Sequence, residues 1–345
     1  MTVATPPRTV RAPRFAGDRR VESWERSVPS PGDGELLLEV RANAICGTDR
    51  ELWERGSSVT PGHEAAGVVT IAGAGTTTPV GTLGVVYLMD FCGACRSCLG
   101  GYTNQCLAKR ADMGFDRDGG YGPYELVHET NFFPVDESMD PAEATLLLDV
   151  MGTAGHAIGR ARLIRPDITS LLVGGAGPIG LGVVAMSRFV LGPDVPVVIG
   201  DVQPDRLVLA EGLGARAVDL RTTTIPEGLA ANDLAEGADV AIDTTGAAPV
   251  RDALLAGLGR RGVLVCVGHG QHLDLDVSRD LIAPERAVLG SEYFAMAELP
   301  GNLALLHEHR ATLSTIVTHR FPRSDIGAAL ELFFSGRTGK VVVVP

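Results

Sequence analysis

The fold is decided by the stretch SLLVGGAGPIG, residues 170–180. Its first part, Ser170–Val173, is a short apolar run that predicts a buried strand. The glycine-rich turn GAGPIG at residues 175–180 follows, and LGVVAMSRFVL at residues 181–191 then predicts a helix. A glycine-rich turn between a strand and a helix brings the free N–H groups of the helix N-terminus close to a bound pyrophosphate. The stretch therefore predicts a dinucleotide-binding unit.

A carboxylate follows at the spacing that such a unit requires. The apolar strand predicted at Val195–Gly200 ends on Asp201, about twenty residues after the last glycine. At that place a carboxylate binds both ribose hydroxyls of NAD and repels the 2′-phosphate of NADP. Arg206 is near enough to bind a 2′-phosphate, so NADP is the alternative cofactor. Because Arg206 is predicted to lie on a helix after Pro204, we expect it instead to stack on adenine or to form a surface ion pair. We expect NAD, and the residues predicted to bind it are Gly175, Gly177, Pro178, Ile179, Gly180, Asp201 and Arg206.

Two more apolar runs extend the alternation of strands and helices. Strands are predicted at Ala238–Asp243 and at Gly262–Gly268. Because strands that alternate with helices form parallel sheets, this half of the chain predicts a doubly wound parallel sheet. Cys266 lies within the last of these strands and is expected to be a buried core thiol rather than a metal ligand.

Three short motifs before residue 150 carry metal-ligand chemistry. They place Cys46 in CGTD, His63 in GHE, and a carboxylate at Asp149. Three protein ligands with a fourth position left open distinguish catalytic from structural zinc. Thr48 offers a hydroxyl two residues past Cys46, where a reacting alcohol could pass its proton. Glu64 is either an occasional fourth ligand or a hydrogen-bonded structural carboxylate, and spacing does not decide between the two.

A second cluster of possible ligands lies between these motifs. FCGACRSCLGGYTNQC, residues 91–106, contains Cys92, Cys95, Cys98 and Cys106. Four thiolates in so short a span can enclose one tetrahedral zinc and leave no open position. Two disulfides are the alternative, which is disfavoured because the start MTVATPPRTVR has no apolar segment that would direct the chain to an oxidising compartment. We therefore predict a structural zinc here and two zinc ions per chain.

Composition excludes some partners. The chain has 345 residues, 45% hydrophobic and 21% charged, as expected for a globular protein of about two domains. Its formal net charge of −12 argues against nucleic acid or an anionic membrane surface as a partner, because phosphates would be repelled. No apolar stretch reaches the roughly 20 residues of a membrane-spanning helix. We expect a cytoplasmic protein with a small-molecule substrate.

The remaining segments predict a small β body and one long helix. Residues 1–30 are rich in Pro and Arg and are expected to include a frayed terminus. Strands are predicted at residues 35–43, 67–73 and 84–89, separated by glycine-rich turns. Pro141–Ala161 is predicted to be a helix with Asp149 and Thr153 on its inner face. Two isolated histidines, His128 and His156, are not expected to touch zinc.

Jointly, these motifs resemble the zinc-dependent medium-chain alcohol and polyol dehydrogenase family, within the medium-chain dehydrogenase/reductase superfamily. CGTD, GHE, the four-Cys segment, the ligand near residue 149, GAGPIG and Asp201 come in the family's order. The tail SGRTGKVVVVP, residues 335–345, looks like its C-terminal strand. The resemblance covers nearly the whole chain.

The resemblance implies an α/β fold of two domains. A GroES-like, mainly-β catalytic domain is expected from residues 1–151 and 291–345. A Rossmann domain with a doubly wound parallel sheet is expected from residues 152–290. It also implies a homo-oligomer, either a dimer or a tetramer.

The resemblance further implies Cys46, Thr48, His63 and Asp149 as catalytic residues. Asp149 stands where family members usually have Glu or Cys, and a carboxylate third ligand is similar to that of polyol, sugar and cyclitol dehydrogenases. We expect hydride transfer between NAD and a secondary alcohol of a polyol, sugar, cyclitol or aminocyclitol, in a biosynthetic route. One alternative is a zinc-containing reductase of a C=C or C=N bond, against which Thr48 argues mildly. The other alternative is a non-enzymatic zinc-ribbon binding protein, against which the acidic net charge and the GAGPIG unit argue.

Overall fold

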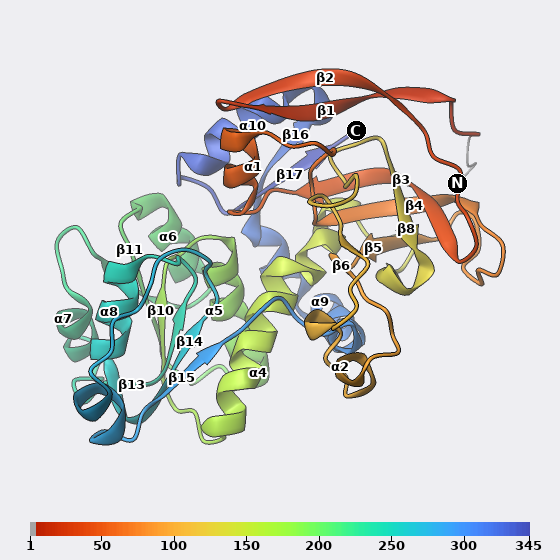
Figure 1. Ribbon diagram of the computed structural model, residues 1–345. Helices are drawn as coiled ribbons and strands as arrows, with labels where there is room; N and C mark the ends of the chain where they lie inside the picture. Colours follow the sequence, from red (N-terminus) through yellow and green to blue (C-terminus); the bar gives the residue numbers. More distant parts are fainter. Residues whose placement is uncertain (1–4) are drawn as a thin grey trace.

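The structure is a computed structural model that describes residues 5–345. Two large sheets form two adjoining bodies, one mainly β and one with helices packed around a parallel sheet (Figure 1). Within the described residues, no helix combines the length and the apolar character that a membrane span needs.

The parallel sheet has six strands in the order β12-β11-β10-β13-β14-β15, and every neighbouring pair is parallel. Its strands are β10 (Leu171–Gly174), β11 (Val197–Asp201), β12 (Arg216–Asp219), β13 (Ala238–Asp243), β14 (Leu258–Cys266) and β15 (Ala287–Gly290). Its helices are α4 (Ala154–Ile164), α5 (Pro178–Val190), α6 (Pro204–Gly212), α7 (Ile225–Ala230) and α8 (Ala248–Ala256). The predicted doubly wound sheet is confirmed, and the direction of winding reverses between β10 and β13.

The second body is built around a seven-stranded sheet from both ends of the chain. Its strands are β3 (Glu35–Ala44), β4 (Ala65–Ala72), β5 (Leu83–Val86), β8 (Tyr124–His128), β9 (Phe132–Pro134), β16 (Val317–Pro322) and β17 (Lys340–Val344). The other elements are α1 (Asp49–Arg55), β6 (Met89–Asp90), α2 (Arg96–Leu99), β7 (Ala111–Asp112), α3 (Pro141–Ala144), α9 (Leu299–Leu313) and α10 (Ile326–Phe334). Because β17 pairs with β3, the end of the chain completes the sheet that its beginning started.

The frayed terminus expected within residues 1–30 is tested only in part, because residues 1–4 lie outside the described part; most of the remaining segment forms strands. Strands β1 (Thr9–Gly17) and β2 (Arg20–Ser27) form an antiparallel hairpin along one side of the β body (Figure 1). Phe15 anchors it: the side chain is fully buried in a cluster with Trp53, and its ring centroid lies 5.7 Å from that of Tyr121. Burial of one aromatic side chain outweighs the disorder that a Pro- and Arg-rich composition favours.

The predicted single helix over residues 141–161 is also wrong. After α3 the chain forms a short 3₁₀ turn, Leu148 has non-helical backbone angles (φ −80°, ψ −108°), and Asp149–Thr153 forms a π-helical turn before α4 begins. Single π-helical turns are frequent at functional sites. Asp149 is the first residue after this break, and its side chain points towards Cys46.

Candidate active site

The four predicted catalytic zinc ligands come together where β3 and β4 of the seven-stranded sheet meet the π-helical turn. One ligand atom from each of Cys46, His63, Glu64 and Asp149 lies within 4.8 Å of the others, and all four residues are buried. Asp149 Oδ2 lies 3.0 Å from Cys46 Sγ and 4.0 Å from His63 Nε2. Cys46 follows β3, His63 and Glu64 precede β4, and Asp149 begins the π-helical turn. Elements from three separate parts of the sequence thus converge on one point.

Asp49 and Tyr121 fix the backbone of the loop that carries Cys46. Asp49 Oδ2 accepts hydrogen bonds from Cys46 N (3.0 Å) and from the Tyr121 hydroxyl (2.6 Å). Its other oxygen, Oδ1, lies 3.7 Å from His63 Nδ1. A carboxylate beside Nδ1 favours the tautomer that leaves Nε2 free to bind a metal. Asp49 thus fixes the loop that carries Cys46 and brings a negative charge close to the His63 ring, without a hydrogen bond to it among the described residues.

The charges of the site match a divalent cation. Burial raises the pKa of Cys46 to about 12, and the neighbouring Asp149 carboxylate adds to the rise. Burial likewise raises the pKa of Glu64 well above its usual value. Lys340, whose Nζ donates a hydrogen bond to Glu64 Oε1, brings one positive charge to these three acidic groups. A Zn²⁺ ion would supply the missing positive charge and hold the thiol as thiolate, so the residues fit the metal.

The position of Glu64 bears on its two predicted roles. One of its oxygens binds Lys340, while the other, Oε2, is buried without a hydrogen-bond partner among the described residues. Both interpretations stay open, because one oxygen serves a structural ion pair and the second is free to approach the metal. The Lys340 partnership was missed by sequence reasoning. Its signal was a lysine directly before the apolar run VVVV at residues 341–344.

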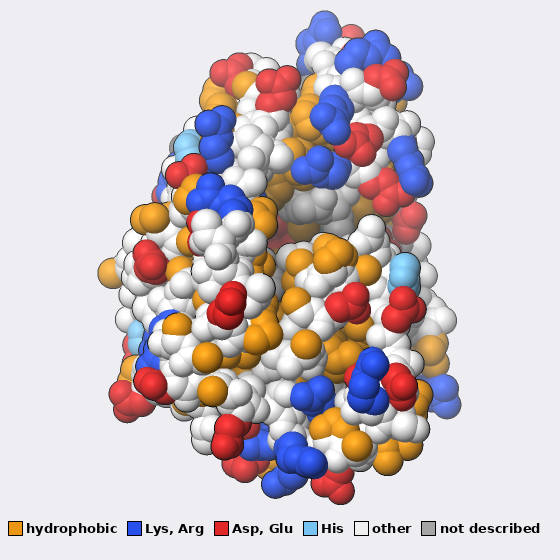
Figure 2. Space-filling view, turned by 90° about the vertical axis from the view of Figure 1, so that its left-hand side faces the viewer, with side chains coloured by type: hydrophobic (Ala, Val, Ile, Leu, Met, Phe, Trp, Pro, Cys, Tyr) orange, Lys and Arg blue, Asp and Glu red, His pale blue; other side chains and the backbone are white. Residues whose placement is uncertain are grey.

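Thr48 lies beside the ligands but is exposed. It precedes α1, and its Oγ1 lies 3.5 Å from His63 Nε2. Figure 2 shows the molecule hollowed between its lower and upper parts, at the level where the two bodies of Figure 1 meet. A hydroxyl that joins a buried ligand set to an open surface is suited to moving a proton between them.

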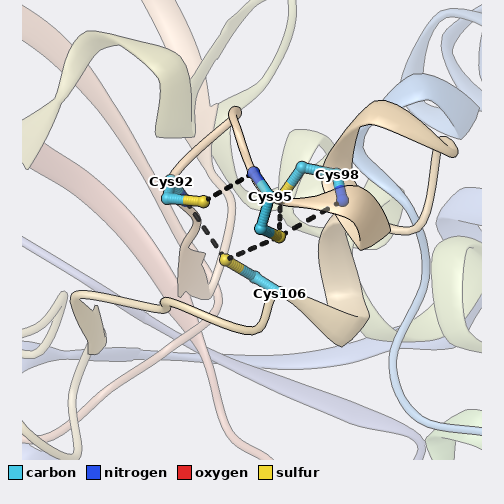
Figure 3. Close-up of side chains that lie close together, drawn as sticks. All are labelled: Cys92, Cys95, Cys98 and Cys106. Atoms are coloured by element: carbon cyan, nitrogen blue, oxygen red, sulfur yellow. Dashed lines mark hydrogen bonds between the residues drawn. The ribbon is translucent and has the colours of Figure 1, made fainter.

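The four remaining predicted ligands form a separate cluster around α2 (Figure 3). Cys95 Sγ lies 3.5 Å from Cys98 Sγ and 4.0 Å from Cys106 Sγ, and all six cysteines of the chain are free thiols. The disulfide alternative is therefore wrong in this structure, since a disulfide bond is about 2.05 Å long. Backbone N–H groups of Cys98 and Leu107 lower the pKa of Cys95 to about 6. Amide donors that favour the thiolate prepare this cluster for a cation.

The glycine-rich turn occupies the carboxyl end of β10, as predicted. Gly175 has φ +92°, and a Cβ on Gly180 would lie 1.9 Å from the Gly175 carbonyl oxygen, so both positions require glycine. Pro178 begins α5 directly after the carboxyl end of β10, so the N-terminus of the helix, with its free N–H groups, lies at the carboxyl ends of the parallel strands. This is the place where open α/β sheets bind dinucleotides.

Asp201 ends the neighbouring strand β11 and is buried. Its Oδ2 accepts from Ala176 N (2.6 Å) and its Oδ1 accepts from Gln203 N (2.8 Å). These bonds fix the carboxylate against the glycine-rich turn and leave further lone pairs for ribose hydroxyls. Arg206 Nε donates to the Thr338 carbonyl (3.0 Å), so it reaches the C-terminal segment. The predicted surface ion pair of Arg206 is absent from residues 5–345.

Two histidines and one cysteine that the sequence analysis did not expect to bind zinc have other surroundings. His128 Nδ1 lies 2.8 Å from Thr130 Oγ1 and His156 Nδ1 lies 2.7 Å from Glu298 Oε1. Among residues 5–345, neither histidine belongs to one of the two clusters of possible metal ligands. Cys266 is likewise outside these clusters. It is only half-buried, however, because it is the last residue of β14 and reaches the edge of the sheet.

Comparison with known proteins agrees with this geometry. Residues 32–137 match the alcohol dehydrogenase GroES-like domain and residues 178–308 match the zinc-binding dehydrogenase family. An L-threonine 3-dehydrogenase of Saccharopolyspora erythraea is 30% identical over 338 residues, which cover 94% of this chain and 95% of that protein. The chain belongs to the zinc-dependent medium-chain dehydrogenase family. The predicted family and the predicted pairing of a GroES-like with a Rossmann fold are therefore confirmed.

Other relatives extend the likeness across the whole chain. YphC of Escherichia coli K12, a zinc-type alcohol dehydrogenase-like protein, is 29% identical over 97% of this chain and 99% of its own length. A cobalt- and zinc-bound thermostable alcohol dehydrogenase from Pyrobaculum aerophilum has a TM-score of 0.83 at 29% identity, covering 98% and 100% of the two chains. The acetophenone reductase of Geotrichum candidum, solved with NAD, has a TM-score of 0.85, covers 99% of both chains and, at 24% identity, shows the fold. As a family member, this chain is an oxidoreductase with zinc and NAD as cofactors, as the sequence predicts.

Proposed function

We propose that this dehydrogenase transfers a hydride between NAD and a secondary alcohol of a polyhydroxylated compound, such as a polyol, sugar, cyclitol or aminocyclitol. The observation that carries the proposal is the carboxylate Asp149, buried 3.0 Å from Cys46 and completing the ligand set. The proposed catalytic zinc ligands are Cys46, His63 and Asp149, with Glu64 next to them. The proposed structural zinc ligands are Cys92, Cys95, Cys98 and Cys106.

The roles of the chain's own groups follow from their positions. When bound, zinc supplies a positive charge that lowers the pKa of an alcohol, and NAD supplies the hydride acceptor. Thr48 Oγ1 accepts a hydrogen bond from the substrate hydroxyl. It then takes up the proton of that hydroxyl while its own proton leaves towards the open side of the site. Asp49 keeps the Cys46 loop in the orientation that ligation needs, through its hydrogen bond to Cys46 N. Burial of the ligands strengthens the charge interactions among them, because little water is near to screen those charges.

A second candidate substrate class is an amino alcohol. The L-threonine 3-dehydrogenases, 29–30% identical to this chain, are named for a secondary alcohol next to an amino group. Aminocyclitols also have a hydroxyl next to an amino group. Polyhydroxylated compounds and amino alcohols therefore require the same zinc chemistry at the reacting hydroxyl, and they differ in the groups around it. We keep both in the test.

The proposal is tested by substrate profiling. Zinc-loaded protein with NAD⁺ is offered polyols, sugars, cyclitols, aminocyclitols, L-threonine and simple alcohols, and NADH formation is followed by absorbance. We expect the highest kcat/KM for a secondary alcohol that has neighbouring hydroxyl or amino groups. A preference for simple primary alcohols, or reduction of C=C or C=N bonds by NADH without any alcohol oxidation, would contradict the proposal.

A further inference from the structure

A buried ion pair lies at the carboxyl end of β13, away from the zinc ligands. Asp243 is the last residue of β13 and is fully buried, and Arg251 on α8 is 8% exposed. Arg251 Nε donates to Asp243 Oδ2 at 2.8 Å. A buried ion pair is weak evidence for a stabilising role, because removing two charges from water costs about as much as their attraction returns. Its other contacts show what it does.

Asp243 shapes the loop that follows its own strand. Its Oδ1 accepts from Thr245 N (2.8 Å), Thr245 Oγ1 (2.7 Å) and Gly246 N (3.1 Å). The same loop touches the glycine-rich turn, because Thr244 Oγ1 donates to the Gly175 carbonyl at 3.1 Å, as well as to the Gly174 carbonyl at the end of β10 at 2.9 Å. The backbone of residues 244–246 is thus fixed by one carboxylate on one side and by the predicted pyrophosphate turn on the other.

Arg251 shapes a second loop, residues 268–271, which follows β14. Its Nη2 donates to the Gly268 carbonyl at 2.5 Å, and its Nη1 donates to the Gln271 carbonyl. The two loops also bind each other directly, since Gln271 N donates to the Gly246 carbonyl at 2.7 Å. A Cβ on Gly246 would lie 2.0 Å from the His269 carbonyl oxygen, so the two backbones are in full contact.

These loops lie where the second half of a dinucleotide has to lie. The strand order reverses between β10 and β13, and a dinucleotide binds across the carboxyl ends at such a point. Asp201, on the β11 side, is placed to bind the adenosine half. The nicotinamide half then extends over the ends of β13 and β14, above residues 244–246 and 268–271.

We propose that Arg251 is a positioning residue for NAD: with Asp243, it holds these two loops in the arrangement that the nicotinamide half of the cofactor requires. The inference rests on the assignment of the glycine-rich turn and Asp201 to NAD. Arginine is needed because its planar fork presents donors in three fixed directions, towards Asp243, Gly268 and Gln271. A lysine has the charge without that geometry.

The test compares whole and half ligands on zinc-loaded protein by titration calorimetry. Arg251→Met and Arg251→Lys should each raise the Kd for NADH about tenfold or more, as expected for the loss of hydrogen bonds from a charged donor. The Kd for AMP, which contacts only the adenosine side, should stay within about twofold of wild type. Steady-state kinetics should show the same split, with KM for NAD⁺ raised more than kcat is lowered.

Arg286 provides a matched control at the opposite edge of the sheet. It also donates from Nε and Nη2 to backbone carbonyls, those of Gly259 and Leu258 at the start of β14. Arg286→Met should lower the melting temperature but leave NADH binding unchanged. If Arg251→Met unfolds, Arg251→Lys provides the test, because it keeps a charge beside Asp243.

Three results separate the possible failures. Equal weakening of NADH and AMP in the Arg251 variants would show a general structural role and overturn the proposal. Unchanged NADH binding in a folded Arg251→Met protein would overturn it as well. Wild-type protein that binds neither NADH nor AMP would instead contradict the cofactor assignment on which the inference rests.

Discussion

At the scale of single residues, Thr48 is exposed at the start of α1, whereas Cys46, His63 and Asp149 are buried beside it. Thr48→Ala should keep both zinc ions and NADH affinity, because no ligand is removed. Turnover should fall by about 10²–10⁴-fold, the usual effect of losing an acid–base group. Metal analysis, NADH titration and kcat on the same preparation check the three statements together.

Thr48→Ser is the matched control, since it keeps a hydroxyl at the same position. It should retain most of the activity that Thr48→Ala loses. Normal turnover by Thr48→Ala would mean that the proton leaves by another route, and it would favour the alternative reductase chemistry.

Asp201 is the residue expected to choose between the two nicotinamide cofactors. Asp201→Ala removes the carboxylate that binds ribose hydroxyls and repels a 2′-phosphate, so NAD use should weaken and the gap to NADP should narrow. The ratio of kcat/KM for NAD⁺ to that for NADP⁺ measures the change. Asp205→Ala, the same charge change at an exposed site on α6, should leave the ratio unaltered. Equal use of both cofactors by the wild-type protein would refute the role given to Asp201.

At the scale of elements, the β1–β2 hairpin depends on one aromatic anchor. Phe15 is fully buried against Tyr121 and Trp53, so Phe15→Ala should cost about 3–5 kcal/mol of the free energy of unfolding. Urea unfolding followed by tryptophan fluorescence reports on it, because Trp53 belongs to the same cluster. Leu163→Ala, at a side chain 76% exposed on α4, should change stability by less than about 0.5 kcal/mol. If both variants were equally stable, the hairpin would not be anchored by Phe15.

At the scale of the whole molecule, the two metal clusters should behave independently. Freshly purified protein should contain two zinc ions per chain. Asp149→Asn should lose zinc from the catalytic site alone, because it removes an anionic ligand and leaves the distant four-Cys cluster unchanged. Cys98→Ser should instead lower the melting temperature and the yield of folded protein, since metal binding at a closed site contributes folding free energy.

Metal content, measured by mass spectrometry beside thermal unfolding, distinguishes these outcomes. An active, folded wild-type protein with one zinc per chain would contradict the assignment of two sites. If Asp149→Asn kept both ions, the third ligand would lie elsewhere, with Glu64 the first candidate. The division into residues 1–151 with 291–345 and residues 152–290, the oligomeric state and the cytoplasmic location stay predictions.

Features encoded in short segments could be predicted from the sequence by itself. The strand, turn and helix around GAGPIG, the four cysteines within fifteen residues, and the CGTD and GHE motifs each depend on spacing along a local backbone. Their geometry follows from the spacing of apolar residues, the placement of glycines and the chemistry of the ligand side chains. The family, the fold class and both clusters of metal ligands could therefore be inferred without coordinates.

Only the tertiary structure decided the contacts between distant segments. Lys340 reaches Glu64 across 276 positions, Phe15 finds Tyr121, and the helix breaks at Leu148 so that Asp149 can meet Cys46. Arg251 likewise takes its acceptors from a loop that follows another strand. No local pattern specifies such partners. A buried charge forms its ion pair, and an aromatic ring packs, with residues that only the folded chain places beside it. Packing and desolvation across the assembled core choose the partner, and both exist only once the two sheets have formed.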